Sequence, residues 1–435
     1  MSTCSSYSNL DIYFAESVTF LKLFHGHCHI KARDLAVHPH PPHVVVGITS
    51  PQTCLVLGGR LRALREAGFR VTLVASPGKM LDCLGDSEGV ETVAIPIARQ
   101  MAPIADLISF ARLSILLMRL RPDMVEFSTP KAGLLGMLAA VLAGIPRRVY
   151  ILRGLKLESA SGVRRRILLA AERMAAACAQ TVVCVSPSLR SKALALGLAS
   201  TDKLQLLGAG SSKGVDTERF HPGASDVRGK FGIPRDAAVI GFVGRFTRDK
   251  GVPALVEAFE LIRQTVPRAY LLMVGWFDEA DDGLDLEMHN RITTHPRIIC
   301  TGFVENTAPY YRAMDLLILP TEREGFPNVV LEASATGIPV ITTLSTGARD
   351  SVVDGKTGIL VPGNPKSLLE ATVRLLRDPN AREQMGAAGR ALVLENFTDQ
   401  RVFGLTTLFY ENLLRQSIIG VPTEQAAMDL AVRLR

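Results

Sequence analysis

Two carboxylates, Glu324 and Glu332, stand eight positions apart around a glycine, a proline and an asparagine in the segment EGFPNVVLE. The apolar run DLLILP before them is typical of a buried parallel strand, and VVLEASATG at their end is typical of a helix that Gly337 terminates. Because proline suits the first turn of a helix, Pro327 places Glu324 in the strand-to-helix loop. Asn328 and Glu332 then share one helix face. Both acids could point into one cleft, although solvated surface charge fits the same pattern.

A second segment, FVGRFTRDKG, carries the cations Arg245, Arg248 and Lys250 directly after the apolar run VIGFVG. A guanidinium can bind phosphate oxygens through two N–H groups, and an ammonium adds a mobile point charge. We therefore predict a diphosphate clamp, in which Arg248 is the residue most readily explained as exposed surface charge. The segment lacks the Gly-Lys-Ser/Thr ending of a P-loop, so it does not indicate ATP hydrolysis.

Short β-branched runs alternate with helical patterns along the chain, as in HVVVGIT, FRVTLVAS and DMVEFS and again in VIGFVG, AYLLMVGW and LLILP. Continuous apolar strands joined by helical crossovers favour a parallel sheet covered on both faces. The sequence thus predicts an α/β protein with two doubly wound parallel-sheet domains. Ligands of such sheets bind beyond the carboxyl ends of the strands, where both candidate loops lie.

The domain boundaries follow from a Gly-, Ser- and Pro-rich break that starts at AGSSKGVD. We predict a poorly ordered extension over 1–42, a first domain over 43–208, a linker over 209–235, a second domain over 236–405, and over 406–435 a C-terminal helix and tail that return to the first domain.

Composition describes an ordinary globular protein, because 47% of the 435 residues are hydrophobic and 21% are charged. The apolar runs are shorter than the roughly 20 residues that cross a bilayer, so no membrane span is expected. Seven cysteines occur without a CxxC pair, which favours reduced core residues and a cytoplasmic location. The start of the chain lacks the pattern of a secretory signal peptide.

The formal net charge is +7, and the positive excess lies in the first half of the chain. Its densest cluster could face anionic lipid headgroups at the inner membrane or a phosphate-bearing substrate, or could be the solvated start of a helix. No aromatic stacking platform accompanies the charge, so nucleic acid is not an expected partner. The cluster comprises Arg147, Arg148, Arg153, Lys156, Arg164, Arg165, Arg166 and Arg173.

Several of these motifs resemble the retaining GT-B glycosyltransferases of family 4, and in particular the bacterial capsule and exopolysaccharide transferases. The resemblance rests on GRFTRDKG, TGFVENTAPYYRAMDLLILPTEREGFPNVVLEASATGIPVITT and VVDGKTGILVP in the second half, and on TPKAGLLGMLAA and YILRGLKLESASGVRRRILLAAERMA in the first. It extends from about residue 43 to about residue 414. It implies two Rossmann-like domains that face each other across a cleft.

The family resemblance implies a hexosyltransferase that holds a nucleotide-sugar donor, expected to be UDP-linked, against the second domain. Arg245 and Lys250 match the basic pair that neutralises the donor diphosphate. Glu324 matches the carboxylate near the donor sugar, and Glu332 matches the one that binds the ribose hydroxyls. The acceptor would be a glycan, free or linked to a polyprenyl diphosphate. Further donor-binding roles are implied for Gly244, Gly325, Phe326, Pro327 and Asn328. Gly302, Phe303 and Val304 match the segment whose backbone usually contacts the base.

The first domain departs from the family pattern in two ways. Many relatives carry a Gly-Gly loop straight after the first strand, whereas Gly58 and Gly59 come later, in a stretch typical of a helix. Many also carry a histidine near the cleft, where this chain has Glu126 and Lys131. Acceptor-side candidates near the predicted strand ends are Arg99, Lys131 and Arg153.

No Asp-x-Asp metal motif follows a strand, and the acidic segment DEADDGLDLE fits a solvated turn better than a calcium loop. We expect no essential metal or other cofactor. Transfer with retention would proceed by same-face attack, since no protein nucleophile stands out; Glu324 as a covalent nucleophile is the alternative. Two other function classes remain, a nucleotide-sugar 2-epimerase and a non-catalytic nucleotide-sugar sensor.

Overall fold

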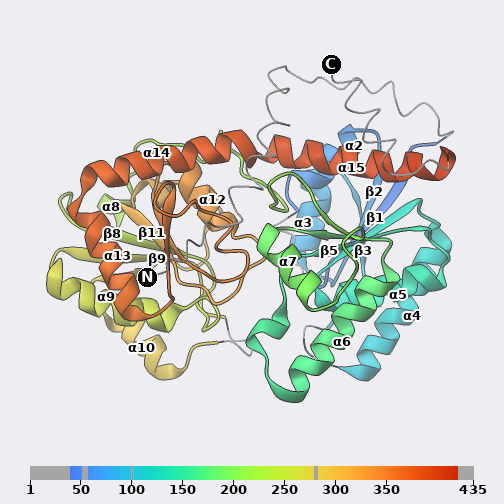
Figure 1. Ribbon diagram of the computed structural model, residues 1–435, viewed down its shortest axis with the longest axis horizontal. Coiled ribbons are helices and arrows are strands. Elements are labelled where there is room, and N and C mark those ends of the chain that lie inside the picture. Colours follow the sequence, from blue (N-terminus) through green and yellow to red (C-terminus); the bar gives the residue numbers. More distant parts are fainter. Residues whose placement is uncertain (1–39, 51–56, 99, 101, 279–282, 420–435) are drawn as a thin grey trace, which may run out of the picture. The chain divides into compact units, whose positions relative to one another are not determined.

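The computed structural model describes residues 40–50, 57–98, 100, 102–278 and 283–419. Most of the predicted N-terminal extension therefore lies outside the described residues. The described part forms two parallel sheets with helices around them (Figure 1). The predicted α/β class with two parallel-sheet domains is confirmed.

The first sheet has seven strands in the order β3-β2-β1-β4-β5-β6-β7 among the described residues. The strands are β1 (His43–Gly47), β2 (Arg70–Ala75), β3 (Glu91–Ala94), β4 (Met124–Ser128), β5 (Arg147–Leu152), β6 (Thr181–Cys184) and β7 (Leu204–Leu206). The connecting helices are α2 (Arg60–Glu66), α3 (Lys79–Glu88), α4 (Pro103–Leu120), α5 (Pro130–Leu142), the short 3-10 helix η3 (Lys156–Ser159), α6 (Gly162–Cys178) and α7 (Pro187–Ala195).

The second sheet has six described strands in the order β10-β9-β8-β11-β12-β13. The strands are β8 (Ala238–Val243), β9 (Ala269–Val274), β10 (Ile298–Cys300), β11 (Leu316–Leu319), β12 (Val340–Thr343) and β13 (Gly358–Val361). The helices are α8 (Val227–Lys230), α9 (Val252–Thr265), α10 (Leu286–Thr294), α11 (Ala308–Arg312), α12 (Asn328–Ala335), α13 (Pro365–Arg377), α14 (Pro379–Asn396) and α15 (Asp399–Ile419).

Both sheets reverse their strand order at the centre, between β1 and β4 in the first and between β8 and β11 in the second. The central strands are buried along almost their whole length, which explains why the sequence shows continuous apolar runs rather than alternation. At such a switch point the loops on either side of the sheet leave a crevice beyond the strand ends. Each domain therefore offers one expected ligand position.

Helix α5 packs between α4 and α6 and against strands β4 and β5 of the first sheet (Figure 1). A Cβ added at Gly133 would lie 2.3 Å from the ring of Tyr150, and one at Gly136 would lie 2.2 Å from the ring of Phe127. The two glycines of the TPKAGLLG motif thus let aromatic side chains of β5 and β4 pack directly on the helix backbone. This packing fixes the carboxyl ends of both strands.

Tyr410 of α15 contacts the first domain. Its hydroxyl donates to Glu126 of β4 and accepts from Arg60 of α2 at 2.8 Å. Arg60 also donates to Glu126, with 2.9 Å between Nη1 and Oε1, and all three side chains are buried. Through this cluster, Tyr410 of α15 contacts the central strand β4 of the first sheet. The domain limits drawn from composition stay a prediction.

Two details differ from the expectations. Gly58 and Gly59 lie in the turn before α2, which begins at Arg60; Gly59 has a positive φ (80°), and Glu88 accepts its N–H at 2.8 Å. Cys83 is exposed rather than part of the core, because it lies on the outer face of α3. Within the described residues, no helix combines the length and apolarity that crossing a membrane requires.

Candidate active site

The basic loop after β8 and the acidic turn after β11 meet at the carboxyl edge of the second sheet, since these two strands are neighbours. Lys250 and Glu324 form an ion pair there, and both side chains are largely shielded from solvent. Gly251 permits the approach, because a Cβ at this position would lie 2.0 Å from the carbonyl oxygen of Pro320. A cation and a carboxylate from separate loops thus converge on one point.

Arg245 forms an ion pair with Asp278, which follows β9. The acidic segment that begins at Asp278 was expected to be a solvated turn, and for this residue the expectation is wrong: its side chain is mostly buried against the guanidinium. Arg248 does not belong to this ion pair; it pairs with Asp285 at 3.3 Å on the exposed surface. Arg245 and Arg248 therefore differ in environment although only two residues separate them.

Asp249 joins the two loops, a role that was not predicted from the sequence. It accepts a hydrogen bond from Thr247 at 2.6 Å and pairs with Arg323 at 2.9 Å, while its carbonyl oxygen accepts the N–H of Glu322 at 2.9 Å. Burial alone would raise the pKa of Asp249, but the hydrogen bond from Thr247 and the charge of Arg323 outweigh it and keep the pKa below its usual value. A buried, ionised carboxylate thus holds the neighbours of Lys250 and Glu324 in place.

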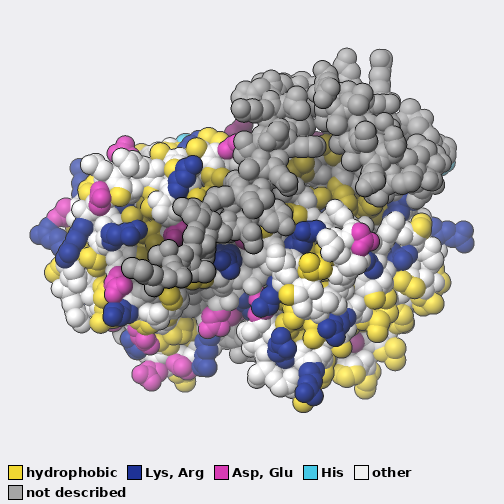
Figure 2. All heavy atoms as spheres, viewed as in Figure 1, with side chains coloured by type: hydrophobic (Ala, Val, Ile, Leu, Met, Phe, Trp, Pro, Cys, Tyr) yellow, Lys and Arg dark blue, Asp and Glu magenta, His cyan; other side chains and the backbone are white. Residues whose placement is uncertain are grey.

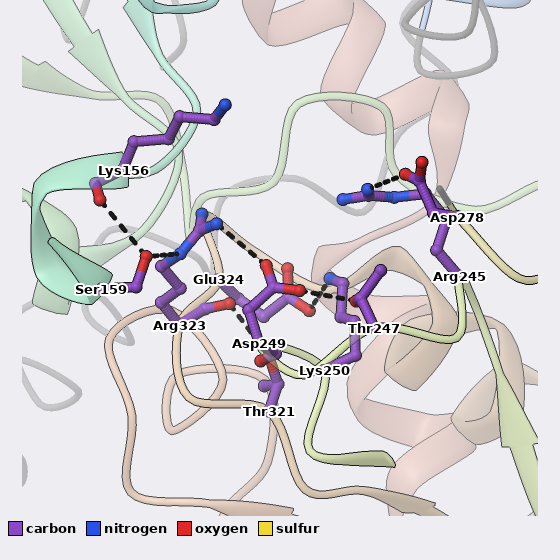
Figure 3. A network of polar contacts seen from close by, with 10 residues as sticks. All are labelled: Lys156, Ser159, Arg245, Thr247, Asp249, Lys250, Asp278, Thr321, Arg323 and Glu324. Atoms are coloured by element: carbon purple, nitrogen blue, oxygen red, sulfur yellow. Dashed lines mark hydrogen bonds and ion pairs between the residues drawn. The ribbon is translucent and has the colours of Figure 1, made fainter. Parts of the chain in front are cut away.

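Arg323 also reaches the first domain, where its Nε donates to Ser159 of η3 at 2.9 Å (Figure 3). Nearby, Thr346 donates to Glu158 at 2.7 Å. A pocket opens beside these contacts with walls from both domains, and its lining is strongly polar. The lining residues are Arg153, Gly154, Leu155, Arg245, Asp249, Lys250, Arg323, Glu324 and Gly325.

The turn after Glu324 packs against the first domain. A Cβ at Gly325 would lie 2.1 Å from the carbonyl oxygen of Arg153, so only glycine fits. Phe326 is buried against Phe397, with 5.2 Å between ring centroids. Pro327 precedes α12, whose first residue is Asn328. The Oδ1 atom of Asn328 is buried and has no hydrogen-bond partner, which leaves an acceptor at the helix start for a ligand to use.

Glu332 lies one turn further along α12 and accepts a hydrogen bond from the hydroxyl of Tyr311 at 2.9 Å. Burial raises the pKa of Glu332, and the charge of Lys213 and the bond from Tyr311 oppose this effect. Neither Glu332 nor Val304 lines the pocket around Lys250. Gly244 directly follows β8, and its carbonyl oxygen would lie 1.8 Å from a Cβ at Gly275.

The three acceptor-side candidates lie in different environments or outside the described residues. Arg153 lines the pocket. Lys131 at the start of α5 is instead paired with Asp106 of α4 at 2.8 Å, and it is not among the pocket residues. Arg99 lies outside the described residues. In the described part of the chain, no group of three or more His, Cys, Asp or Glu side chains is arranged to hold a metal ion.

Comparison with known proteins identifies the family. The family model described as "Glycosyl transferase 4-like domain" matches residues 56–210, and the one described as "Glycosyl transferases group 1" matches residues 237–378. The capsular polysaccharide biosynthesis glycosyltransferase CapM of Staphylococcus aureus is 34% identical over 372 residues, which cover 85% of this chain and 97% of that protein. The chain belongs to the group 1 glycosyl transferases. Its identification as a glycosyltransferase favours this activity over the epimerase and sensor alternatives.

Other similar proteins agree with this assignment. The glycosyltransferase is 28% identical to the UDP-Gal:alpha-D-GlcNAc-diphosphoundecaprenol alpha-1,3-galactosyltransferase of Escherichia coli, over 71% of this chain and 81% of that one. Sucrose-phosphate synthase of Thermosynechococcus elongatus has a similar structure, with a TM-score of 0.72, 20% identity and coverage of 86% and 99%. Anabaena Alr3699/HepE in complex with UDP and glucose gives a TM-score of 0.69, 19% identity and coverage of 85% and 98%. These structures confirm the expected GT-B fold.

Proposed function

We propose that this glycosyltransferase moves a hexose from a UDP-sugar to a lipid-linked glycan in surface polysaccharide synthesis, with retention at the anomeric carbon. The observation that carries the proposal is the ion pair between Lys250 and Glu324, which brings the predicted phosphate-binding cation and the predicted sugar-binding carboxylate to one point. Chemistry on a phosphate-linked sugar needs both groups, a cation for the leaving phosphate and an anion for the sugar ring.

Each predicted phosphate-binding cation forms an ion pair with a carboxylate, Lys250 with Glu324 and Arg245 with Asp278. The donor diphosphate would replace the carboxylates as the partner of these cations. Glu324 would then turn to the hydroxyls of the donor sugar. Such an exchange keeps the cations paired at every stage, so the site avoids the large penalty of an uncompensated charge.

The transfer itself breaks the bond between the anomeric carbon and the donor phosphate oxygen and forms a bond from that carbon to the acceptor oxygen. The acceptor hydroxyl gives its proton to the departing phosphate oxygen on the same face of the sugar, which yields retention without a protein nucleophile. Lys250 and Arg245 stabilise the negative charge that develops on the nucleoside diphosphate. Glu324 stabilises the positive charge on the ring.

Two relatives support the choice of substrates. The structure of Anabaena Alr3699/HepE is a complex with UDP and glucose, and the name of the Escherichia coli relative gives a UDP-sugar donor and a diphosphoundecaprenol-linked acceptor sugar. The acceptor would lie against the first domain, opposite the donor loops. Glu332 would bind the ribose, since its carboxylate already accepts a hydroxyl hydrogen bond from Tyr311.

An enzyme that acts on a lipid-linked acceptor works at a membrane surface. The first domain has an exposed face that could bind such a surface. Apolar side chains on α4 and α6 are exposed, among them Ile104 (79%), Leu107 (68%) and Val163 (71%). Arg165 and Arg166 are exposed beside Val163. Figure 2 shows hydrophobic and basic side chains together on the face over α4, α5 and α6. We infer peripheral binding to an anionic membrane through this face, with the apolar groups inserting and the arginines pairing with headgroups.

The test is an incubation with a panel of UDP-, GDP- and ADP-hexoses, with and without an acceptor sugar linked to a polyprenyl diphosphate. We expect a new glycosidic product only when acceptor and UDP-sugar are both present, with an α-linkage from an α-linked donor. An epimerised sugar formed without acceptor would instead identify an isomerase. Tight donor binding with no product from any acceptor would identify a sensor.

A further inference from the structure

Arg153 is a buried cation without a partner in the described part of the chain. Its Nε, Nη1 and Nη2 atoms are all inaccessible to solvent and make no hydrogen bond. An unpaired buried guanidinium is among the least favourable arrangements in a folded protein. Arg148, on the strand β5 that precedes Arg153, shows the usual solution: its Nε donates to the carbonyl oxygen of Cys178 at 2.6 Å. The guanidinium of Arg153 could therefore bind an anion, because the described part of the chain supplies no hydrogen-bond partner for it.

The surroundings of Arg153 carry a surplus of positive charge. Arg60 and Glu126 are the charged groups that act on it: burial first, and then the charge of Arg60, lowers the pKa of Arg153 to about 10, whereas Glu126 opposes the shift. Glu126 is not its hydrogen-bond partner: its carboxylate oxygens accept bonds from Arg60 and Tyr410, and the Arg153 nitrogens make none. One net positive charge is left over in this buried cluster.

The cluster lies where the first sheet is expected to bind a ligand. Glu126 and Ser128 are on β4, next to β1 across the switch point, and Arg153 directly follows β5. Ser128 pairs in register with Ile151, and Arg153 follows two residues later, just past the end of β5. The hydroxyl of Ser128 is also buried and without a partner. An unpaired guanidinium and an unpaired hydroxyl at one strand edge match the donors that a phosphate group accepts.

The same residue borders the proposed reaction site. Its backbone carbonyl touches the turn at Gly325, one residue after Glu324, and Arg153 is part of the pocket lining. The cations proposed for the donor diphosphate, Lys250 and Arg245, come from the second domain instead. A phosphate held by Arg153 would thus sit on the acceptor side of Glu324, in the first domain.

We propose that Arg153, assisted by Ser128, binds a phosphate group of the acceptor, so that the enzyme selects an acceptor sugar joined directly to a phosphate. The inference rests on the proposed function and names its acceptor class. A phosphate attached to the acceptor sugar would orient that ring and bring one of its hydroxyls to the donor. A neutral oligosaccharide without the phosphate would leave Arg153 buried and unpaired.

The test compares Arg153→Met with a matched control, Arg148→Met, by thermal unfolding in phosphate-free buffer and with added inorganic phosphate or pyrophosphate. Each titration is run with and without saturating UDP, which fills the donor site. We expect Arg153→Met to unfold at the same or a higher temperature than wild type without phosphate, because an unpaired charge is removed. In wild type with UDP bound, added phosphate should still raise the unfolding temperature. Arg153→Met should lose most of this increase. Arg148→Met should unfold at a lower temperature and keep the increase.

The transfer reaction gives a second readout. Arg153→Met should raise KM for a diphosphate-linked acceptor at least about tenfold and leave KM for the donor within about twofold, a difference of about 1.4 kcal/mol in acceptor binding. A phosphate response that is equal in wild type and Arg153→Met overturns the inference. So does a loss of UDP affinity in Arg153→Met, which would assign the residue to the donor. Failure of wild type to bind any nucleotide would refute the proposed donor site, while the titration without UDP still tests Arg153.

Discussion

Among single residues, the predicted chemistry depends on pairs of opposite charge that exchange partners. Lys250 and Glu324 neutralise each other as an ion pair, and each is predicted to bind a different part of the donor. Removing either one leaves the other charge uncompensated in a shielded site, so binding and reaction should both suffer.

We predict that Glu324→Gln and Lys250→Ala each lower the turnover number for sugar transfer by two or more orders of magnitude, which is about 3 kcal/mol of transition-state stabilisation. Their circular dichroism spectra should match the wild-type spectrum, because neither residue belongs to the core. Glu322→Gln, an exposed neighbour in the same loop, is the control and should keep nearly full activity. Near-normal turnover in both site variants would remove these residues from the mechanism.

The sequence singles out more candidate site residues in the second domain than in the first. Glu324, Lys250 and Arg245 could be singled out because charged side chains in short loops after apolar strands are visible in one dimension. Asp249 lies between Arg248 and Lys250 in the sequence, but its role could not be predicted there. Only the folded structure shows that its carboxylate pairs with Arg323. Arg60 gave no signal, because an arginine in a helix is usually solvated and its burial depends on contacts 66 and 350 residues away.

Among the secondary-structure elements, Asp249 fixes the loop after β8 to the loop after β11. Because the pKa of Asp249 is lowered in the folded protein, its stabilising contribution is present above the ordinary carboxyl pKa and is lost as the pH falls through the lowered value. The loops should therefore be held most firmly at neutral pH.

Asp249→Asn should reduce the free energy of unfolding at pH 7 by about 2 kcal/mol, the magnitude typical of a hydrogen bond to a charged group. Urea denaturation monitored by fluorescence would measure it. The control is Asp285→Asn, which removes an exposed ion pair with Arg248 and should change stability by less than about 1 kcal/mol. Equal losses in the two variants would show that burial of Asp249 has no special effect.

The fold could be predicted at the level of elements because buried parallel strands and their helical crossovers leave distinct patterns. The turn at Gly58 and Gly59 was mistaken for helix, since the leucines on either side, Leu57 and Leu61, continue a helix-like pattern across the boundary at which Gly59 adopts a positive φ. The buried side chain of Asp278 could not be foreseen either. Its burial comes from Arg245, which is 33 residues earlier in the chain.

For the molecule as a whole, the proposed transfer to a lipid-linked acceptor implies that the first domain binds a membrane surface. The exposed apolar groups of α4 and α6 lie among arginines, so binding should need both insertion and negative headgroups. We predict that the double variant Ile104→Ser, Leu107→Ser binds vesicles containing phosphatidylglycerol several-fold more weakly than wild type in a sedimentation assay.

The matched control is Leu286→Ser, which removes an equally exposed apolar side chain from the start of α10 in the second domain (82% exposed). It should leave vesicle binding unchanged. Wild-type binding should weaken with salt and vanish on phosphatidylcholine vesicles. Equal binding by the control and the double variant, or no preference for anionic lipid, would exclude this face as the membrane contact.

The proposed mechanism depends above all on Lys250 binding the phosphate that leaves with the nucleotide. The decisive experiment is calorimetric titration of UDP and UMP into wild type and Lys250→Met, with Arg248→Met from the same loop as control. Wild type and the control should bind UDP about tenfold or more tightly than UMP. Lys250→Met should lose most of that preference while its affinity for UMP stays the same. An undiminished preference for UDP in Lys250→Met would show that Lys250 does not bind the departing phosphate.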